Sequence, residues 1–177
     1  MRRIRTHYLL LATVFFLLWP PNNFLLVTAG SAVVPLATHQ PLAIIVNRSN
    51  PIENLSSAEL RKIFLGERYR WENGHRVTVT MLDPGFPERE SMLRFVYRMT
   101  ESEYRDHFLK GTYTGDIPVS PKTLSSPETL RKFVFNAPGA IGYLRRSDVD
   151  GSVKVVSIDG HFPGDLEYKL LIEGPNE

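Results

Sequence analysis

The feature that most constrains the fold is a continuous apolar run, Leu42-Ala43-Ile44-Ile45-Val46. A strand that faces water on one side alternates apolar and polar residues, whereas this run presents apolar side chains to both faces. It is also rich in β-branched residues, which favour a strand in so short a segment. The run therefore predicts a central strand that other elements cover on both faces.

The next segment has the local signals of a helix. Ser56 stands three residues before Glu59, which is the spacing of a capping box, and Gly66 suits the left-handed residue that ends a helix. Between these signals, one face of the predicted helix carries Leu60, Ile63 and Phe64. This helix is expected to bury that face against the strand at residues 42–46.

Strands and helices alternate through the rest of the chain. Strands are predicted at residues 76–82, 153–158 and 166–172, and residues 136–144 are predicted to form a turn followed by a short strand, with a loop at 112–122. Helices are predicted at residues 87–99, from the capping box of Thr100 and Glu103 to Lys110 with Gly111 closing it, and after Ser126-Pro127-Glu128. This order predicts an α/β fold, three-layer αβα with a mixed sheet.

The first residues have the pattern of an export signal. Basic residues at positions 2, 3 and 5 precede an apolar run at residues 8–18, and the small residues at 29–32 offer a cleavage site. We predict a signal peptide at residues 1–32, a leader at 33–41 and one domain at 42–177. The alternative to cleavage is a retained membrane anchor. Either way the domain is expected to be periplasmic or secreted.

Composition excludes several classes of function. The chain has 21 Lys and Arg against 19 Asp and Glu, and cleavage would remove three arginines, so the electrostatic argument for nucleic acid is lost. The chain contains no cysteine, and its five histidines lack metal-ligand spacing. Asp83, Glu88 and Glu90 are close enough for acid–base work, but solvated acids at a helix start are far commoner. The sequence predicts no enzyme, no metal site and no cofactor.

Three blocks together indicate a family. They are IVNRSNPIENLSSAELRKIFLGERYRWENGHRVTVTML at residues 45–82, PERESMLRF at 87–95 and NAPGAIGYL at 136–144. In order and spacing these blocks resemble small exported, single-domain proteins that are related to the phosphate-binding component of phosphate ABC transporters. The resemblance implies a periplasmic-binding-protein-like fold of type II, in which two lobes close on the ligand. The blocks are those of one lobe, so this chain is expected to resemble one lobe.

The resemblance also places an anion cradle at residues 83–91. The family's turn resembles Ser-Asp-Gly-Ser-Gly-Thr-Thr, whose hydroxyl and N–H groups wrap the anion. Here Pro84 and Pro87 lack N–H groups, and Glu88 and Glu90 bring negative charge. A helix start supplies up to about 2 kcal/mol, whereas a micromolar site requires about 8 kcal/mol. The cradle alone is therefore expected to bind poorly.

Arg89 is the local cation that could change this expectation. Its guanidinium could grip an oxyanion through two parallel hydrogen bonds. The alternative is an ion pair with Glu90 or another neighbouring acid. Other donors are expected at strand ends, where open α/β sheets place ligands. The candidate ligand-binding residues are Arg48, Ser49, Asn50, Ser57, Gly85, Arg89, Gly139 and Ala140.

Two functions are consistent with these features. The first is an exported solute-binding protein, intact or degenerate, that binds phosphate or a related oxyanion and works with a membrane ABC transporter. The alternative is a module without a small ligand that docks on a membrane sensor or another exported protein, alone or as a homodimer. Exposed aromatic residues would form the contact surface of such a module, namely Tyr69, Trp71 and Tyr113, although Trp71 also suits the core.

Overall fold

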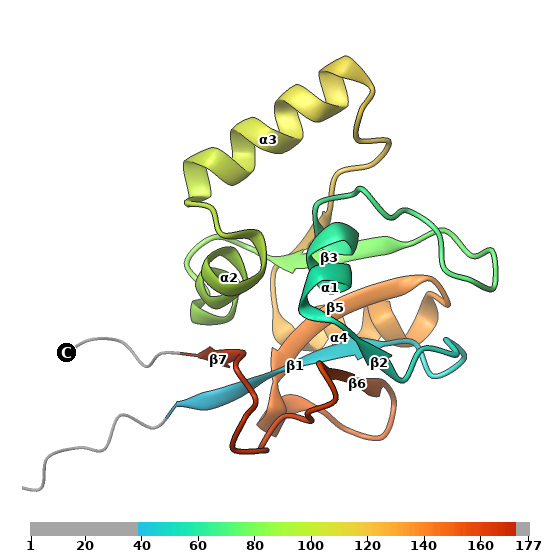
Figure 1. Ribbon diagram of the computed structural model, residues 1–177, viewed down its shortest axis with the longest axis vertical. Coiled ribbons are helices and arrows are strands. Elements are labelled where there is room, and N and C mark those ends of the chain that lie inside the picture. Colours follow the sequence, from blue (N-terminus) through green and yellow to red (C-terminus); the bar gives the residue numbers. More distant parts are fainter. Residues whose placement is uncertain (1–38, 173–177) are drawn as a thin grey trace, which may run out of the picture. The chain divides into compact units, whose positions relative to one another are not determined.

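A mixed sheet forms the centre of the protein. The computed structural model describes residues 39–172, so the predicted signal peptide and the leader up to residue 38 lie outside the described residues. Within this range the strands follow the order β2-β6-β1-β5-β3-β4, and β7 pairs with the start of β1 (Figure 1). The strands are β1 Gln40–Val46, β2 Asn54–Leu55, β3 Thr78–Leu82, β4 Lys122–Leu124, β5 Ala140–Arg145, β6 Lys154–Ile158 and β7 Leu171–Ile172.

Because β1 runs opposite to the strands beside it, its end lies next to their starts. β1 is antiparallel to β5, β6 and β7, whereas β3 is parallel to β4 and β5, and β2 is parallel to β6. We call the edge at which β3, β4, β5 and β6 end the carboxyl edge. The opposite edge, at which β1 ends, is the amino edge. Gln40, at the start of β1, therefore lies at the carboxyl edge.

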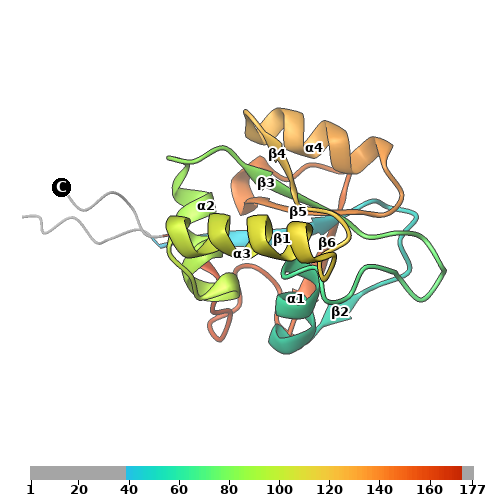
Figure 2. The same cartoon turned by 90° about the horizontal axis from the view of Figure 1, so that it is seen from above.

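Helices cover both faces of the sheet. Figure 2 shows α4 (Pro127–Asn136) on one face, and α1 (Ser57–Phe64) and α2 (Pro87–Met92) on the other. The apolar run in β1 is fully buried, as a strand covered on both faces requires. The predicted three-layer αβα fold with a mixed sheet is confirmed.

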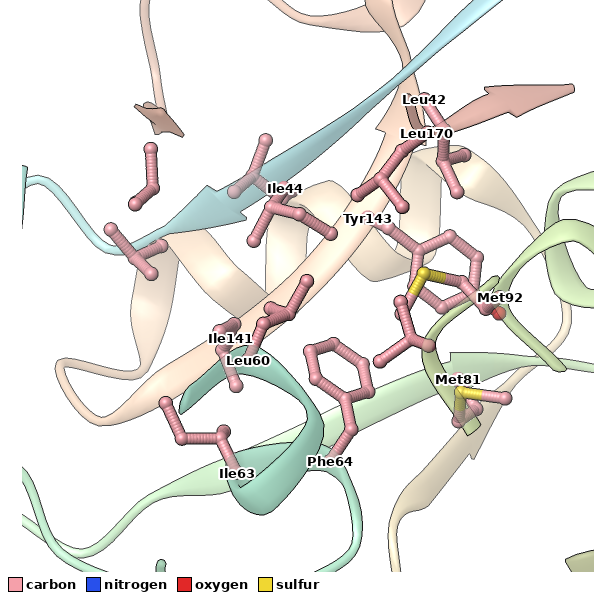
Figure 3. Close-up of a cluster of buried hydrophobic side chains, with 14 of the residues drawn as sticks. Leu42, Ile44, Leu60, Ile63, Phe64, Met81, Met92, Ile141, Tyr143 and Leu170 are labelled. Carbon is pink, nitrogen blue, oxygen red and sulfur yellow. The ribbon is translucent and has the colours of Figure 1, made fainter. Parts of the chain in front are cut away.

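The main core lies between the sheet and α1. The capping box of Ser56 and Glu59 starts this helix, and Gly66 follows it at φ +82, as predicted. The apolar residues of α1 form its buried face. Figure 3 shows that face meeting side chains of β1, β3 and β5, with Leu60, Ile63 and Phe64 close to Ile44, Met81, Ile141 and Tyr143.

The helix predicted at residues 87–99 is shorter and ends differently. α2 continues into a π-helical segment, η1 (Leu93–Tyr97), and Arg98 then adopts a left-handed conformation at φ 57. Both features are uncommon, and together they turn the chain before α3 (Glu101–Thr114) begins at its predicted capping box. Met99 consequently lies in the joint between η1 and α3 rather than inside a helix.

Gly111 does not close α3, so that prediction was wrong. The helix continues to Thr114 and ends at Gly115, which has φ +79. At Gly111 a Cβ atom would lie 2.4 Å from Cδ1 of Ile117, in the segment that returns from α3. The glycine is therefore explained by close packing and not by a helix stop.

The predicted strands differ from the observed ones mainly where the observed strand has only two or three residues. β2 and β4 were not predicted, and the strand expected at residues 166–172 is reduced to β7. Segments of two or three residues are too short for an alternating pattern to reveal them. β1 begins at Gln40, so Gln40 and Pro41 belong to the sheet rather than to the predicted leader.

Gly142, in the middle of β5, has no room for a side chain. A Cβ atom there would lie 2.3 Å from Thr80 Oγ1 and 2.7 Å from Leu130 Cδ2. We expect Gly142→Ala to lower the free energy of unfolding by about 2 kcal/mol, because both neighbours are packed in the core. Urea denaturation measures this change. Gly151→Ala is the control, since no atom lies within 4 Å of its added Cβ. Equal stabilities for the two variants would contradict the packing around Gly142.

Candidate anion-binding site

The eight candidate residues do not form one cluster. Ser57, Gly85 and Arg89 follow the ends of strands and lie at the carboxyl edge. The others lie at the amino edge, because β1 ends beside the start of β5; they are Arg48, Ser49, Asn50, Gly139 and Ala140. The antiparallel course of β1 separates the two groups, and no local sequence signal reveals that course.

The loop after β1 makes hydrogen bonds within itself and to the neighbouring loop. The Asn47 side-chain oxygen accepts hydrogen bonds from Ser49 N at 2.9 Å and Ser49 Oγ at 2.7 Å. Arg48 is exposed and donates to the Gly151 carbonyl. Asn50 is buried; its Oδ1 accepts from the N–H of Ile52 at 3.1 Å, while Nδ2 has no partner among the described residues. Apart from that one amide, the contacts are those of a structural turn.

Gly139 is explained by packing at the amino edge. A Cβ atom at this position would lie 2.0 Å from the Arg76 carbonyl oxygen. The Gly139 carbonyl accepts hydrogen bonds from Thr78 N at 3.0 Å and from Trp71 Nε1 at 2.9 Å, and Ala140 pairs with Thr78 in the sheet. Trp71 is therefore buried, which confirms its assignment to the core and removes it from the proposed exposed aromatic surface.

The start of α1 already interacts with a carboxylate of the chain itself. Asp159, directly after β6, accepts hydrogen bonds from Ser57 N at 2.8 Å and from the Ser57 hydroxyl. The hydroxyl, together with the N–H group, holds the pKa of Asp159 below its ordinary value. The Ser57 donors at this helix start are consequently engaged by a residue that lies far away in the sequence.

The contact between Asp159 and Ser57 makes stability depend on pH. Because the folded pKa of Asp159 is lowered, its stabilisation is complete above the unfolded pKa, about 4, and is lost as the pH falls through the folded pKa. We expect Asp159→Asn to lower the free energy of unfolding by about 0.5 to 1 kcal/mol at pH 7 and by less at pH 3. Urea denaturation at both pH values measures this, with the exposed Asp106→Asn as control. An equal loss at pH 3 and pH 7 would contradict the assignment.

The turn after β3 brings Arg89 to the carboxyl edge. Gly85 adopts φ +96 in this turn, and Pro87 begins α2. Arg89 is only 3% exposed, and its Nη1 donates to the Leu82 carbonyl at 2.7 Å. Nε and Nη2 donate to the two carboxylate oxygens of Glu101 at 2.9 and 2.7 Å. The guanidinium therefore forms a bidentate pair with a carboxylate of the chain.

These contacts favour the interpretation of Arg89 as one partner of an ion pair within the chain. Burial works against the charge of Arg89, but the hydrogen bonds and the charge of Glu101 outweigh it and raise the pKa of Arg89. The guanidinium carbon also lies 4.9 Å from the centroid of the Tyr104 ring. Burial in turn raises the pKa of Tyr104 to about 12. The expected ion pair is present, with Glu101 rather than Glu90 as the partner.

A second ion pair at this edge was not predicted. Glu88 is 2% exposed, so its interpretation as a solvated acid was wrong. Arg145, at the end of β5, donates from Nε to Glu88 Oε1 and from Nη1 to Gln40 Oε1, the latter at 2.9 Å. Glu88 Oε2 has no hydrogen-bond partner within residues 39–172. The one sequence signal for this burial was the position of Glu88 four residues before the apolar Met92, on the same helix face.

A groove borders the pair of Arg89 and Glu101. It has a volume of about 340 Å³ and lies where the start of α3 comes beside α2 (Figure 1). Its lining consists of Pro84, Gly85, Arg89, Glu90, Leu93, Arg94, Met99, Thr100 and Glu101. The described residues contain no group of three or more side chains arranged to hold a metal ion. The arginine and glutamate side chains of the lining offer hydrogen bonding and charge pairing.

Comparison with known proteins identifies the relationship. No protein-family model matches the chain. The phosphate-binding protein PstS of Bacillus subtilis is 31% identical to it over 123 residues, which is 69% of this chain and 37% of that protein. The chain is a partial relative of the PstS phosphate-binding proteins. The resemblance seen in the sequence is thereby confirmed.

Solved structures show the same relationship at the level of the fold. An ABC-type phosphate transport receptor from Vibrio cholerae has a TM-score of 0.57 and 21% identity, covering 71% of this chain and 48% of the receptor. PstS from Borrelia burgdorferi has a TM-score of 0.60 and 15% identity, covering 77% of this chain and 56% of that protein. The chain thus matches about half the length of these receptors.

Proposed function

We propose that this PstS-like chain is an exported receptor lobe that binds phosphate or a related oxyanion and works with a membrane ABC transporter. The homology to PstS supports this role, and it supports a binding protein rather than an enzyme. The proposal places the domain in the periplasm or outside the cell. No helix within the described residues is long and apolar enough to cross a membrane.

The observation that carries the proposal is the guanidinium of Arg89 beside the groove. The Leu82 carbonyl holds Nη1 from behind, while Nε and Nη2 face a carboxylate whose side chain is 43% exposed. Glu101 can therefore move into water while Arg89 stays in place. An oxyanion would then accept the two hydrogen bonds that Glu101 gives up.

The same geometry predicts weak binding in the native chain. Two charge-assisted hydrogen bonds contribute about 3 to 6 kcal/mol, but the anion must first displace a carboxylate that makes the same two bonds. The altered turn offers little compensation, because Pro84 and Pro87 have no N–H group to donate. The dissociation constant for phosphate is thus expected to be about 1 mM or weaker, which corresponds to about 4 kcal/mol.

Replacing the competing carboxylate tests the proposed function. We expect Glu101→Gln to tighten phosphate binding about tenfold, because it removes both the competitor and a negative charge beside the anion. Titration calorimetry of the full chain measures the affinity. Glu90→Gln is the matched control, since this exposed residue lines the same groove but makes no hydrogen bond to Arg89 in the described structure. Equal gains from both variants would contradict displacement at Arg89, and absence of binding by Glu101→Gln would contradict the proposed function.

A second candidate function is a docking module without a small ligand. It is supported by the occupied state of the site, where Arg89 and Arg145 already bind carboxylates of the chain. Exposed tyrosines offer a contact surface, since Tyr113 is 92% exposed and Tyr69 is 52% exposed. Light scattering would detect a homodimer, and capture from an envelope extract would detect a membrane partner. A monomer that captures no partner, together with phosphate binding by Glu101→Gln, would contradict this alternative.

A further inference from the structure

The groove beside Arg89 is larger than a small inorganic anion requires. Its volume of about 340 Å³ falls within the range of about 300 to 1,000 Å³ that is typical of pockets for organic ligands. Within the pair of Arg89 and Glu101, one carboxylate accepts the hydrogen bonds of Nε and Nη2. A group of that size is sufficient for these two donors, and it is smaller than the groove.

The remaining lining is partly apolar. Leu93 comes from η1 and Met99 from the joint before α3, and Pro84 borders the groove from the turn. Leu93 is buried and Met99 packs against the core, so their positions are fixed by the fold. Arg89 is itself buried, which places its charge deep beside these apolar side chains. The groove thus combines a fixed cationic group with an apolar wall.

We infer that this groove binds a small organic oxyanion, a phosphate monoester, phosphonate or carboxylate with an apolar body, in preference to inorganic phosphate. The inference rests on the proposed function, because it requires an anion to take the place of Glu101 on Arg89. An inorganic anion would leave the apolar wall in contact with water. An organic body covers that wall and gains the free energy of burying apolar surface.

The test compares anions that share either the phosphate head group or the phenyl body. Phenyl phosphate, benzoate and inorganic phosphate are titrated into the full chain carrying Glu101→Gln, with calorimetry as the readout. Burial of about 50 Å² of apolar surface corresponds to about tenfold in affinity, so phenyl phosphate is expected to bind about tenfold more tightly than inorganic phosphate. Benzoate is expected to bind at a strength near that of phenyl phosphate, and absence of benzoate binding would overturn the inference for carboxylates.

A variant of the apolar wall provides the second comparison. Met99→Gln in the same background is expected to reduce the preference for phenyl phosphate over inorganic phosphate to about threefold. Phe135→Gln is the control, because it removes an exposed apolar side chain from α4, outside the groove. Nuclear Overhauser contacts between the phenyl protons and the Met99 methyl group give a readout that does not depend on the stability of a variant.

The outcomes separate this inference from the proposed function. If Glu101→Gln binds inorganic phosphate as tightly as phenyl phosphate, the inference is overturned and the proposed function stands. If Glu101→Gln binds none of the three anions, the proposed function fails and the inference fails with it. A preference for phenyl phosphate without contacts to Met99 would also overturn the inference, because the apolar body would then lie elsewhere.

Discussion

Arg145→Met is expected to lower the free energy of unfolding by about 3 to 5 kcal/mol. Arg145 is the ion-pair partner of Glu88, whose side chain is 3% exposed. Its removal leaves a carboxylate in the protein interior, where one oxygen already lacks a partner in the described part of the chain. Because methionine retains most of the aliphatic length of arginine, the fall in the free energy of unfolding measures mainly the cost of leaving the charge of Glu88 unpaired. Urea denaturation at neutral pH measures it.

Two further variants separate charge from packing at this pair. The double variant Glu88→Gln with Arg145→Met is expected to recover at least half of the loss, because a neutral amide costs less to bury than a carboxylate. Arg146→Met, at the exposed next residue, is expected to change stability by less than about 0.5 kcal/mol. If Arg145→Met costs no more than Arg146→Met, Glu88 is not held as a buried ion in solution.

Arg89→Met is expected to lower the free energy of unfolding by about 3 kcal/mol and to abolish the phosphate binding gained through Glu101→Gln. The variant loses the hydrogen bonds to Leu82 and Glu101 and the contact with the Tyr104 ring. The cost is smaller than at Arg145 because Glu101, the carboxylate left behind, is 43% exposed and can be solvated. Urea denaturation measures the stability, and calorimetry in the Glu101→Gln background measures the binding.

The control for Arg89→Met is another arginine of the same region. Arg105 lies exposed on α3, so Arg105→Met removes the same charge without breaking a buried contact. It is expected to change stability by less than about 0.5 kcal/mol and to weaken phosphate binding only slightly, through screened long-range charge. Phosphate binding that survives Arg89→Met in the Glu101→Gln background would locate the anion elsewhere.

The sequence correctly predicted those parts of the fold that depend on residues close together in the chain. Ser56 with Glu59 and Thr100 with Glu103 fixed two helix starts, because a capping box involves residues only three positions apart. The buried run in β1 similarly predicted a strand covered on both faces. The π-segment and the left-handed Arg98 have no such signal, since they result from how α2 and α3 pack onto the rest of the chain.

The sequence predicted the turn that carries Arg89, but it did not predict the partners of Arg89 and Ser57. The turn at Gly85 and the presence of Arg89 beside it followed from the order of elements. The pairing of Arg89 with Glu101 depends on the joint between η1 and α3, and that of Ser57 with Asp159 depends on two strands being adjacent in the sheet. Such contacts are set by tertiary structure, so the sequence analysis named Glu90 or another neighbouring acid as the partner of Arg89 and did not single out Glu101.

The most direct test of anion binding at Arg89 is a crystal structure of the Glu101→Gln variant grown with inorganic phosphate. We expect one phosphate bound to Nε and Nη2 of Arg89, with Nη1 still donating to the Leu82 carbonyl. A phosphate found instead at the amino edge, on Arg48, Ser49 and Asn50, would contradict it. So would an Arg89 whose guanidinium remains without an anion at a phosphate concentration that saturates binding in solution.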